Sequence, residues 1–299
     1  MGKSELRGEL RRQLRGLLQG RARGQSRWES PEARNDPAGE LQVVTYNIHK
    51  GFSQFNRHLV VHELRERLRA IGADLVFLQE VQGEHSRHAQ RFGNWPLGPQ
   101  HDFLAEDVWP ASAYGSNVIY DHGHHGNAIL SRFPIENVHN QDVTHLRFER
   151  RGLLHCTINV PGLARTLHCV CVHLSLFARS RRRQLASLAA YLEDLAAPES
   201  PLIIAGDFND WRNEADDLLA RRLGLEEVFG GVVGSIGVPG RSFPAKLPVL
   251  RLDRIYLRGF SVRRAEVHFG APWSKISDHA ALSATLQSTL GEGVSRVTG

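Results

Sequence analysis

Residues 202–210 read LIIAGDFND, an apolar run that ends in Gly206, Asp207 and Asn209. The apolar part predicts a buried β-strand, and side-chain alternation along an extended chain places Asp207 and Asn209 on the same side. An aspartate there can take a proton from water or orient it, and the amide can donate to a non-bridging phosphate oxygen. A tight turn is the alternative interpretation, because glycine, aspartate and asparagine also favour turns for local reasons.

Further polar clusters follow the same rule, each beside an apolar run that is typical of a strand. Carboxylates, amides and imidazoles at strand ends can hold a hard divalent cation beside a phosphate oxygen and orient water against phosphorus. The sequence has neither a G-x-x-x-x-G-K-[ST] loop nor a G-x-S-x-G elbow, which leaves hydrolysis by water. The clusters are Asn47 in TYNIHKG, Glu80 in VFLQEV, His173 in VCVHLS, Asp253 in RLDRIY, and Asp278 with His279 in SDHAAL.

The residue types suggest a division of labour among these clusters. Glu80 is the expected direct ligand of Mg²⁺, and Asn47 would orient that carboxylate or contact the phosphate. His279 can donate to a phosphate oxygen or protonate a leaving alkoxide, with Asp253 fixing its tautomer. Asp278 points to the opposite face of an extended chain and can serve the metal. Strand-end capping by Asn47 and a structural ion pair of Asp253 are the alternatives.

Arginines strengthen the case for His173 as a substrate-facing residue. Four of them lie within residues 179–183, where a helix is predicted to begin, and Arg151 precedes another strand-like run. Such side chains can face an anionic substrate. The alternatives are a packed core histidine and a solvated basic helix face. The histidines of residues 121–127 (DHGHHGN) resemble a metal-binding tract, but their turn-like composition favours a loop.

Length and composition predict one main domain. The chain has 299 residues, 41% of them hydrophobic, and no linker-like break separates the polar clusters. The mean hydropathy of -0.32 is typical of a globular protein with a substantial core. We predict a domain at residues 41–287, a basic amphipathic tail and linker at 1–40, and a disordered tail at 288–299.

Charge and cysteine content bear on partners and location. Residues 1–40 contain nine Lys and Arg against six acids, so they carry +3 of the net charge of +5 and leave +2 for the rest. That balance does not indicate a long groove for a polyanion. Leucines at helical spacing in residues 1–20 predict a frayed cationic helix or, alternatively, a peripheral membrane contact. Three cysteines inside apolar runs and the lack of an apolar run of ~18 residues favour the cytoplasm.

Strand-like runs alternate with a few helical stretches, which predicts an α/β fold of two packed sheets flanked by helices. Helices are expected near residues 59–71, 180–196 and 214–222, and a long loop at 82–113. Strands are expected at residues 41–48, 73–80, 116–120, 127–131, 153–160, 165–174, 201–207, 249–257, 261–269 and 279–286.

The ordered motifs resemble the endonuclease/exonuclease/phosphatase superfamily, the deoxyribonuclease I-like group, between about Leu41 and Leu286. They are TYNIHKG, LQEV, GNAILSR, HLS, GDFND, LDRIY and SDHAAL. The resemblance implies a four-layered α/β sandwich, with two mostly antiparallel sheets face to face, helices outside and the site at one edge. As a whole, the motifs are most similar to bacterial members whose substrates are undefined.

The resemblance also implies roles for individual residues. Glu80 matches the metal-binding glutamate, with Asn47 beside it. Asp207 and Asn209 match the pair that handles the attacking water and the phosphate. His279 matches the catalytic histidine.

The remaining positions complete that set. Asp253 matches the partner of the catalytic histidine, and Asp278 matches a further acid that can contact a metal. His173 matches the additional histidine of the deoxyribonuclease, sphingomyelinase and 5-phosphatase branches. Asn127 and Arg151 fit phosphate-side positions. The abasic-site branch carries a Tyr-x-Pro-Asn-type segment where this chain has VCVHLS, which argues against that branch.

The expected activity is therefore Mg²⁺-dependent phosphoester hydrolysis of a phosphodiesterase or nuclease-like kind, with Mn²⁺ as a substitute. The expected substrate is a nucleic acid or a phospholipid or phosphoinositide, and no obligate protein partner is indicated. A lipid-directed phosphatase or phospholipase C-like enzyme at the membrane surface is the alternative, suggested by residues 1–20 and by loops bearing Trp95 and Trp109. A catalytically silent binding module would lack a catalytic group, and the motifs lack none.

Overall fold

The computed structural model describes residues 40–53, 58–230 and 240–290, all within the compact unit formed by residues 37–299. The tail predicted at residues 1–40 lies outside the described residues except for its last position, and so does most of the predicted C-terminal tail. Ser288, which was assigned to that tail, instead ends the last strand.

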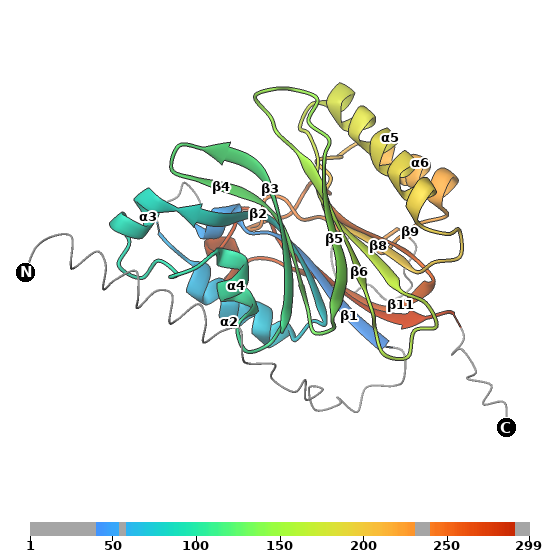
Figure 1. Ribbon diagram of the computed structural model, residues 1–299, viewed down its shortest axis with the longest axis horizontal. Helices are drawn as coiled ribbons and strands as arrows, with labels where there is room; N and C mark the ends of the chain where they lie inside the picture. Colours follow the sequence, from blue (N-terminus) through green and yellow to red (C-terminus); the bar gives the residue numbers. More distant parts are fainter. Residues whose placement is uncertain (1–39, 54–57, 231–239, 291–299) are drawn as a thin grey trace, which may run out of the picture. The chain divides into compact units, whose positions relative to one another are not determined.

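The strands form two six-stranded sheets (Figure 1). The first sheet has the order β11-β12-β1-β2-β4-β3, with β1 at Glu40–Asn47, β2 at Leu75–His85, β3 at Ala111–Tyr120, β4 at Gly123–Ser131, β11 at Phe260–His268 and β12 at Ala281–Ser288. The second has the order β5-β6-β7-β8-β10-β9, with β5 at Ile135–Asp142, β6 at Gly152–Ile158, β7 at Leu167–His173, β8 at Leu202–Asp207, β9 at Glu226–Glu227 and β10 at Asp253–Arg258.

Each sheet has one parallel pair at its centre. Strands β1 and β2 run parallel and are joined through helix α2 (Val61–Ile71), while β7 and β8 run parallel and are joined through α5 (Ala178–Leu195). All other neighbouring strands pair antiparallel, so the prediction of two mostly antiparallel sheets is confirmed.

Side-chain alternation explains the four layers. Val43 and Leu75 belong to a core between the sheets, whereas their neighbours Val44 and Val76 pack outward against α2 and α4 (Gln100–Ala105). The second sheet repeats the pattern, with α5 and α6 (Glu214–Leu223) covering its outer face. Burial of a large apolar side chain is worth about 1.5–3 kcal/mol, so a register slip that inverted both faces would be costly. The predicted α/β sandwich is confirmed.

Several local predictions were wrong. Strand β5 was not expected, because its residues are mostly exposed and polar. The predicted loop at 82–113 contains the end of β2, helix α3 (Ser86–Arg91) and α4. Two of the histidines assigned to a loop, His124 and His125, lie on β4. Trp109 is buried and donates through Nε1 to the carbonyl of Ala73, so it offers nothing to a membrane.

Other predictions agree with the structure. The three cysteines are free and buried, and burial raises the pKa of Cys156 and Cys171 to about 12, which makes them inert packing residues. Short 3₁₀ helices, η1 (His49–Gly51) and η3 (Trp273–Lys275), lie in the connections after β1 and β11. Among the described helices, none combines the length and the apolar character needed to span a bilayer.

Candidate active site

Strand register alone brings three predicted site residues side by side. His173 pairs with Asp207 across β7 and β8, and Asp207 pairs with Asp253 across β8 and β10. Cys171 and Ala205, two residues earlier on β7 and β8, belong to the core between the sheets. Because every second side chain shares a face, His173 and Asp207 also point toward the opposite sheet.

The amide of Asn47 reaches Asp207 from that opposite sheet. It ends β1, and its Nδ2 donates to Asp207 Oδ2 at 3.1 Å. The backbone N–H of Asn209 donates to Asp207 Oδ1 at 3.0 Å. Both carboxylate oxygens of Asp207 are therefore held in place. The expected role of Asn47 beside Glu80 or the phosphate stays a prediction.

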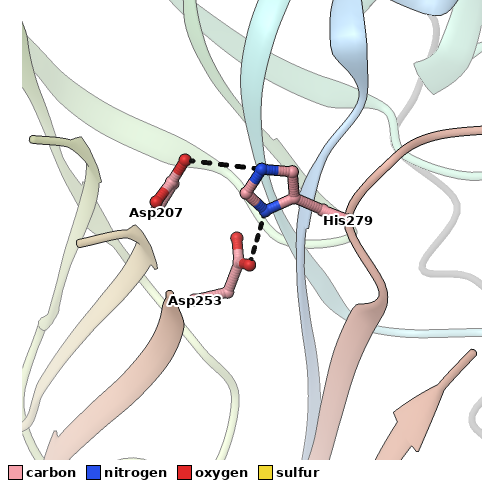
Figure 2. Close-up of side chains that lie close together, drawn as sticks. All are labelled: Asp207, Asp253 and His279. Carbon is pink, nitrogen blue, oxygen red and sulfur yellow. Dashed lines mark hydrogen bonds and ion pairs between the residues drawn. The ribbon is translucent and has the colours of Figure 1, made fainter. Parts of the chain in front are cut away.

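Figure 2 shows the ring of His279 between two carboxylates. His279 Nδ1 donates to Asp253 Oδ2 at 2.7 Å, and Nε2 lies 3.9 Å from Asp207 Oδ2. His173 Nε2 approaches the same oxygen of Asp207 at 3.5 Å. The Asp253 contact fixes the tautomer, since a carboxylate only accepts, and it leaves Nε2 facing Asp207.

Ser277 ties the histidine segment to the end of β1. Its hydroxyl donates to the carbonyl of Asn47 at 2.7 Å and accepts the backbone N–H of His279 at 3.2 Å. This buried contact sets the position of His279 relative to Asn47, so the SDHAAL motif acts through its serine as well as through its charged residues.

Burial alone favours the neutral form of each of these groups, so it raises the pKa of Asp207 and lowers the pKa of His279 and His173. Burial raises the pKa of Asp207 to about 7, and the charge of Asp253 adds to this, although His279 opposes it. Burial would lower the pKa of His279, but Asp253 and Asp207 raise it to about 10. Burial and the charge of Arg151 hold the pKa of His173 well below its usual range. Near neutral pH, the site contains an imidazolium, a neutral imidazole and a carboxyl close to its midpoint.

A β-bulge aims Glu80 at the site. Strand β2 pairs Leu78 with Ala128 and then Val81 with Gly126, so two residues of β2 face one residue of β4. The bulge inverts the alternation, and Val81 packs outward where regular alternation would turn it inward. Glu80 takes a φ of 57°, and β2 continues to His85, so the expected place of Glu80 at a strand end was wrong. Bulges commonly redirect a side chain beside an active site.

Glu80 fits a ligand for a divalent cation. Lys50 Nζ lies 3.6 Å from Glu80 Oε2, and that oxygen is buried without a hydrogen bond to any residue that the structure describes. Burial would raise the pKa of Glu80, but His173 in its protonated form and Lys50 lower it to about 2, so Glu80 is ionised. A buried, ionised oxygen that lacks a hydrogen-bond donor is suited to coordinate a hard cation.

A second group of potential ligand atoms comprises Asp207, Asp253 and His279, whose atoms lie within 4.8 Å of one another. The same geometry is also suited to proton transfer. His279 Nδ1 already donates to Asp253 at 2.7 Å, and a protonated ring has no lone pair for a metal. The pKa of His279, which Asp253 and Asp207 raise to about 10 against the effect of burial, is typical of a proton donor.

The other predicted site residues have defined contacts. Both hydrogen bonds of the Asn127 amide go to backbone carbonyls of the second sheet, those of Gly152 at 3.0 Å and Cys171 at 3.3 Å. Arg151 donates through Nε to the carbonyl of Leu174 at 3.2 Å, which fixes the loop after β7. The phosphate role of Asn127 and Arg151 stays a prediction.

Asp278 lies next to the buried pair and is partly exposed. Its Oδ1 accepts the Ser277 hydroxyl at 3.4 Å, and its backbone carbonyl accepts the N–H of Ala245 at 2.7 Å. Its other carboxylate oxygen, Oδ2, accepts no hydrogen bond from the residues that the structure describes, and the role of Asp278 as a second metal contact stays a prediction.

Sequence patterns did not indicate three features of the site. Lys50 was quoted only as part of a motif, and nothing suggested its ion pair with Glu80. Asn209 has a φ of 50°, so it shares with Glu80 a left-handed backbone that is strained outside glycine. Gly206 has a φ of 149°, and a Cβ there would lie 2.0 Å from the carbonyl of Val172. The glycine of GDFND is thus required by the close approach of β7.

Comparison with known proteins identifies the family. The model of the Endonuclease/Exonuclease/phosphatase family matches residues 44–279, and the chain belongs to this family. It is 45% identical over 246 residues to the uncharacterized protein YbhP of Escherichia coli K12, covering 82% of this chain and 96% of YbhP. The predicted likeness to uncharacterised bacterial members is confirmed.

Solved structures share the fold. An endonuclease/exonuclease/phosphatase from Beutenbergia cavernae has a TM-score of 0.66 at 21% identity, covering 85% of this chain and 72% of that one. TDP2 from D. rerio, solved with a single-stranded DNA product, has a TM-score of 0.59 at 17% identity, covering 83% and 99%.

Proposed function

We propose that this family member is a divalent-metal-dependent hydrolase of phosphoesters, and of phosphodiesters in particular, with water as the nucleophile. One observation carries the proposal. Asp207 and His279 form a buried base and acid whose pKa values are both raised, to about 7 and about 10, next to the ionised carboxylate of Glu80. Strongly shifted pKa values among buried neighbours are typical of acid–base catalysis.

In the proposed reaction, Asp207 takes a proton from water as the water oxygen forms its bond to phosphorus. Asn47 and the Asn209 backbone hold the carboxylate, so one direction of approach is favoured. As the bond from phosphorus to the leaving oxygen breaks, His279 Nε2 gives that oxygen its proton. Asp253 stabilises the imidazolium before the transfer.

Two side chains would bind the phosphate or a cation. His173, neutral at this pH, can donate one hydrogen bond to a phosphoryl oxygen. Glu80 would hold a divalent cation, with Asp278 as a further oxygen ligand. Mg²⁺ or Mn²⁺ at this position supplies Lewis-acid stabilisation of the charge on the phosphoryl oxygens. The buried thiols support a reducing location such as the cytoplasm.

The likeness to TDP2, solved with a single-stranded DNA product, supports nucleic-acid phosphodiesters as one substrate class to test. The experiment offers bis-p-nitrophenyl phosphate, plasmid DNA, single-stranded DNA and RNA with Mg²⁺, Mn²⁺ or EDTA. Asp207→Asn should abolish turnover, whereas Asp217→Asn, an exposed carboxylate on α6, should not change it. Full activity in EDTA would remove the metal from the proposal. Turnover of no substrate by the wild-type protein would favour a silent binding module.

A further inference from the structure

Exposed apolar side chains gather on the loops at the catalytic edge. Among the described residues, ten large apolar side chains are at least 45% exposed, and six of them lie on these loops. Large apolar side chains scattered singly over a surface are common, but several of them gathered on neighbouring loops indicate a contact surface. We call these six residues the rim: Phe148, Leu176, Phe177, Trp211, Leu247 and Val249.

Backbone contacts place the rim around the site. Leu176 follows His173 on the loop after β7, and Phe148 lies in the loop between β5 and β6, which Arg151 ties to Leu174. Figure 1 shows the β5–β6 loop beside the beginning of α5, in agreement with the hydrogen bond between His145 and Ser180. Trp211 lies two residues after Asn209 in the loop after β8.

The other two rim residues, Leu247 and Val249, lie in the loop before β10. This loop is bound to the segment that carries His279, because the N–H of Ala245 donates to the carbonyl of Asp278 at 2.7 Å. The ring of Phe243 in the same loop lies 5.2 Å from that of His279. The rim therefore has members on the loops that follow His173 and Asp207 and on the loop beside His279.

The loops that carry four of the rim residues have an excess of positive charge. Residues 143–151, 174–183 and 208–214 contain eight arginines and three acids. Each acid already pairs with an arginine: Glu149 with Arg151, Glu214 with Arg182, and Asp210 with Arg181. The other five arginines form no ion pair with an acid in the described part of the chain, although Arg150 and Arg212 act electrostatically on Asp142 and Glu214. These five are Arg147, Arg150, Arg179, Arg183 and Arg212.

We propose that the rim docks on an anionic phospholipid bilayer and presents the candidate active site to a headgroup phosphoester. Apolar side chains on loop tips can enter the boundary between headgroups and acyl chains, while arginines bind the phosphate layer. The positive charge of these loops is complementary to an anionic surface. The nearly balanced charge of the whole chain hides this local excess. The inference rests on the proposed hydrolase function and names the substrate class of the same site.

The chemistry of the rim favours lipid over single-stranded nucleic acid. Stacking on bases requires free aromatic faces, yet Leu176, Leu247 and Val249 are aliphatic. Phe148 and Phe177 pack edge to face, with ring centres 6.0 Å apart at 85°, as a compact apolar unit. Half of the rim would thus have no partner in a base stack, whereas all of it can be buried in a bilayer.

The test uses the full chain and vesicle co-sedimentation. Vesicles of phosphatidylcholine alone are compared with vesicles that also contain phosphatidylglycerol. The rim variant carries Phe148→Ser, Leu176→Ser and Phe177→Ser. The matched control carries Val138→Ser and Leu195→Ser, which are 52% and 51% exposed but lie on β5 and at the far end of α5.

We expect the wild-type protein and the control to bind the anionic vesicles alike and the rim variant to bind at least about 100-fold more weakly. This follows because each apolar side chain removed from water strengthens partitioning about tenfold. Turnover of soluble bis-p-nitrophenyl phosphate by the rim variant should match wild type, because none of its three positions is part of the catalytic machinery.

The docking proposal and the hydrolase proposal can be refuted independently, because vesicle binding and turnover are measured separately. If the wild-type protein hydrolyses nothing but sediments through the rim, the docking surface stands and the hydrolase proposal is wrong. Equal vesicle binding by wild type and rim variant would overturn the docking surface, as would no binding by wild type. Rim-dependent binding of single-stranded DNA in place of vesicles would overturn it in favour of a nucleic-acid surface.

Discussion

Replacement of Asp253 by asparagine removes the charge that keeps His279 protonated. Asp253 is buried, and its Oδ2 accepts from His279 Nδ1 at 2.7 Å. Asparagine has nearly the same volume, so packing changes little. Burial lowers the pKa of His279 and Asp253 is the leading opposing influence, so the ring should lose part of the rise to about 10.

The size of the effect follows from the hydrogen bond. A bond to a charged partner is worth about 1.5–3 kcal/mol and one between neutral groups about 1 kcal/mol. The difference of about 1–2 kcal/mol corresponds to a fall of roughly one unit in the pKa of His279. Loss of a well-poised general acid and of its fixed tautomer should lower kcat about 10²–10³-fold.

The assay is Mg²⁺-dependent turnover of bis-p-nitrophenyl phosphate as a function of pH. His279 acts in its protonated form, so activity falls as pH rises through its pKa, and Asp253→Asn should move this alkaline limb to lower pH. KM should change little, because Asp253 contacts His279 and not the substrate. Asp217→Asn is the matched control, and thermal melting verifies folding. An unchanged kcat with an unmoved alkaline limb would refute the assignment of His279 as acid.

Three further predictions concern metal binding, strand packing and acid stability. Glu80→Gln should weaken Mg²⁺ binding by roughly 10–100-fold in calorimetry through loss of a charged ligand, and unchanged affinity would exclude Glu80 as a ligand. Gly206→Ala should destabilise the protein by at least about 3 kcal/mol in urea unfolding, since its Cβ would meet the Val172 carbonyl at 2.0 Å. Burial lowers the pKa of His155 from 6.5 to about 4, so the unfolded chain binds the proton first and stability should fall as pH drops from about 6.5 to 4. His155→Asn should flatten that decline, and an unaltered acid-unfolding curve would contradict it.

Buried elements were predictable because their patterns are strong. The helix expected at 180–196 is α5 at Ala178–Leu195, and the strand expected at 201–207 is β8 at Leu202–Asp207. Strand β5 escaped because IENVHNQD is an edge strand with mostly exposed side chains. This strand forms through backbone hydrogen bonds to β6. Such bonds do not require apolar side chains at alternate positions, so the sequence of the segment carries no periodic signal.

The identities of the polar site residues were visible in the sequence, whereas their partners were not. Glu80 could be named from its place beside an apolar run, but only the bulge turns it to the site, and a one-residue change in pairing has no signature in VFLQEV. The contact of Asn47 with Asp207 could likewise not be foreseen, because it spans the two sheets. Such contacts depend on how the sheets stack, which local patterns do not specify.

The catalytic groups depend on the packing between the sheets more than on either sheet alone. Asn47 stands on the first sheet and Asp207 on the second, and the segment before β12 of the first sheet carries His279 to Asp253 of the second. The core beneath has its own polar link, because Gln79 Nε2 on β2 contacts Cys171 Sγ on β7 at 3.2 Å. A shift of one sheet against the other would therefore break two contacts at once. It would separate Asp207 from the amide of Asn47, and His279 from the carboxylate of Asp253. The outer helices take part in neither the Asn47–Asp207 nor the His279–Asp253 contact. Truncation of an apolar side chain between the sheets should therefore impair proton transfer more than an equal truncation beneath α2 or α5.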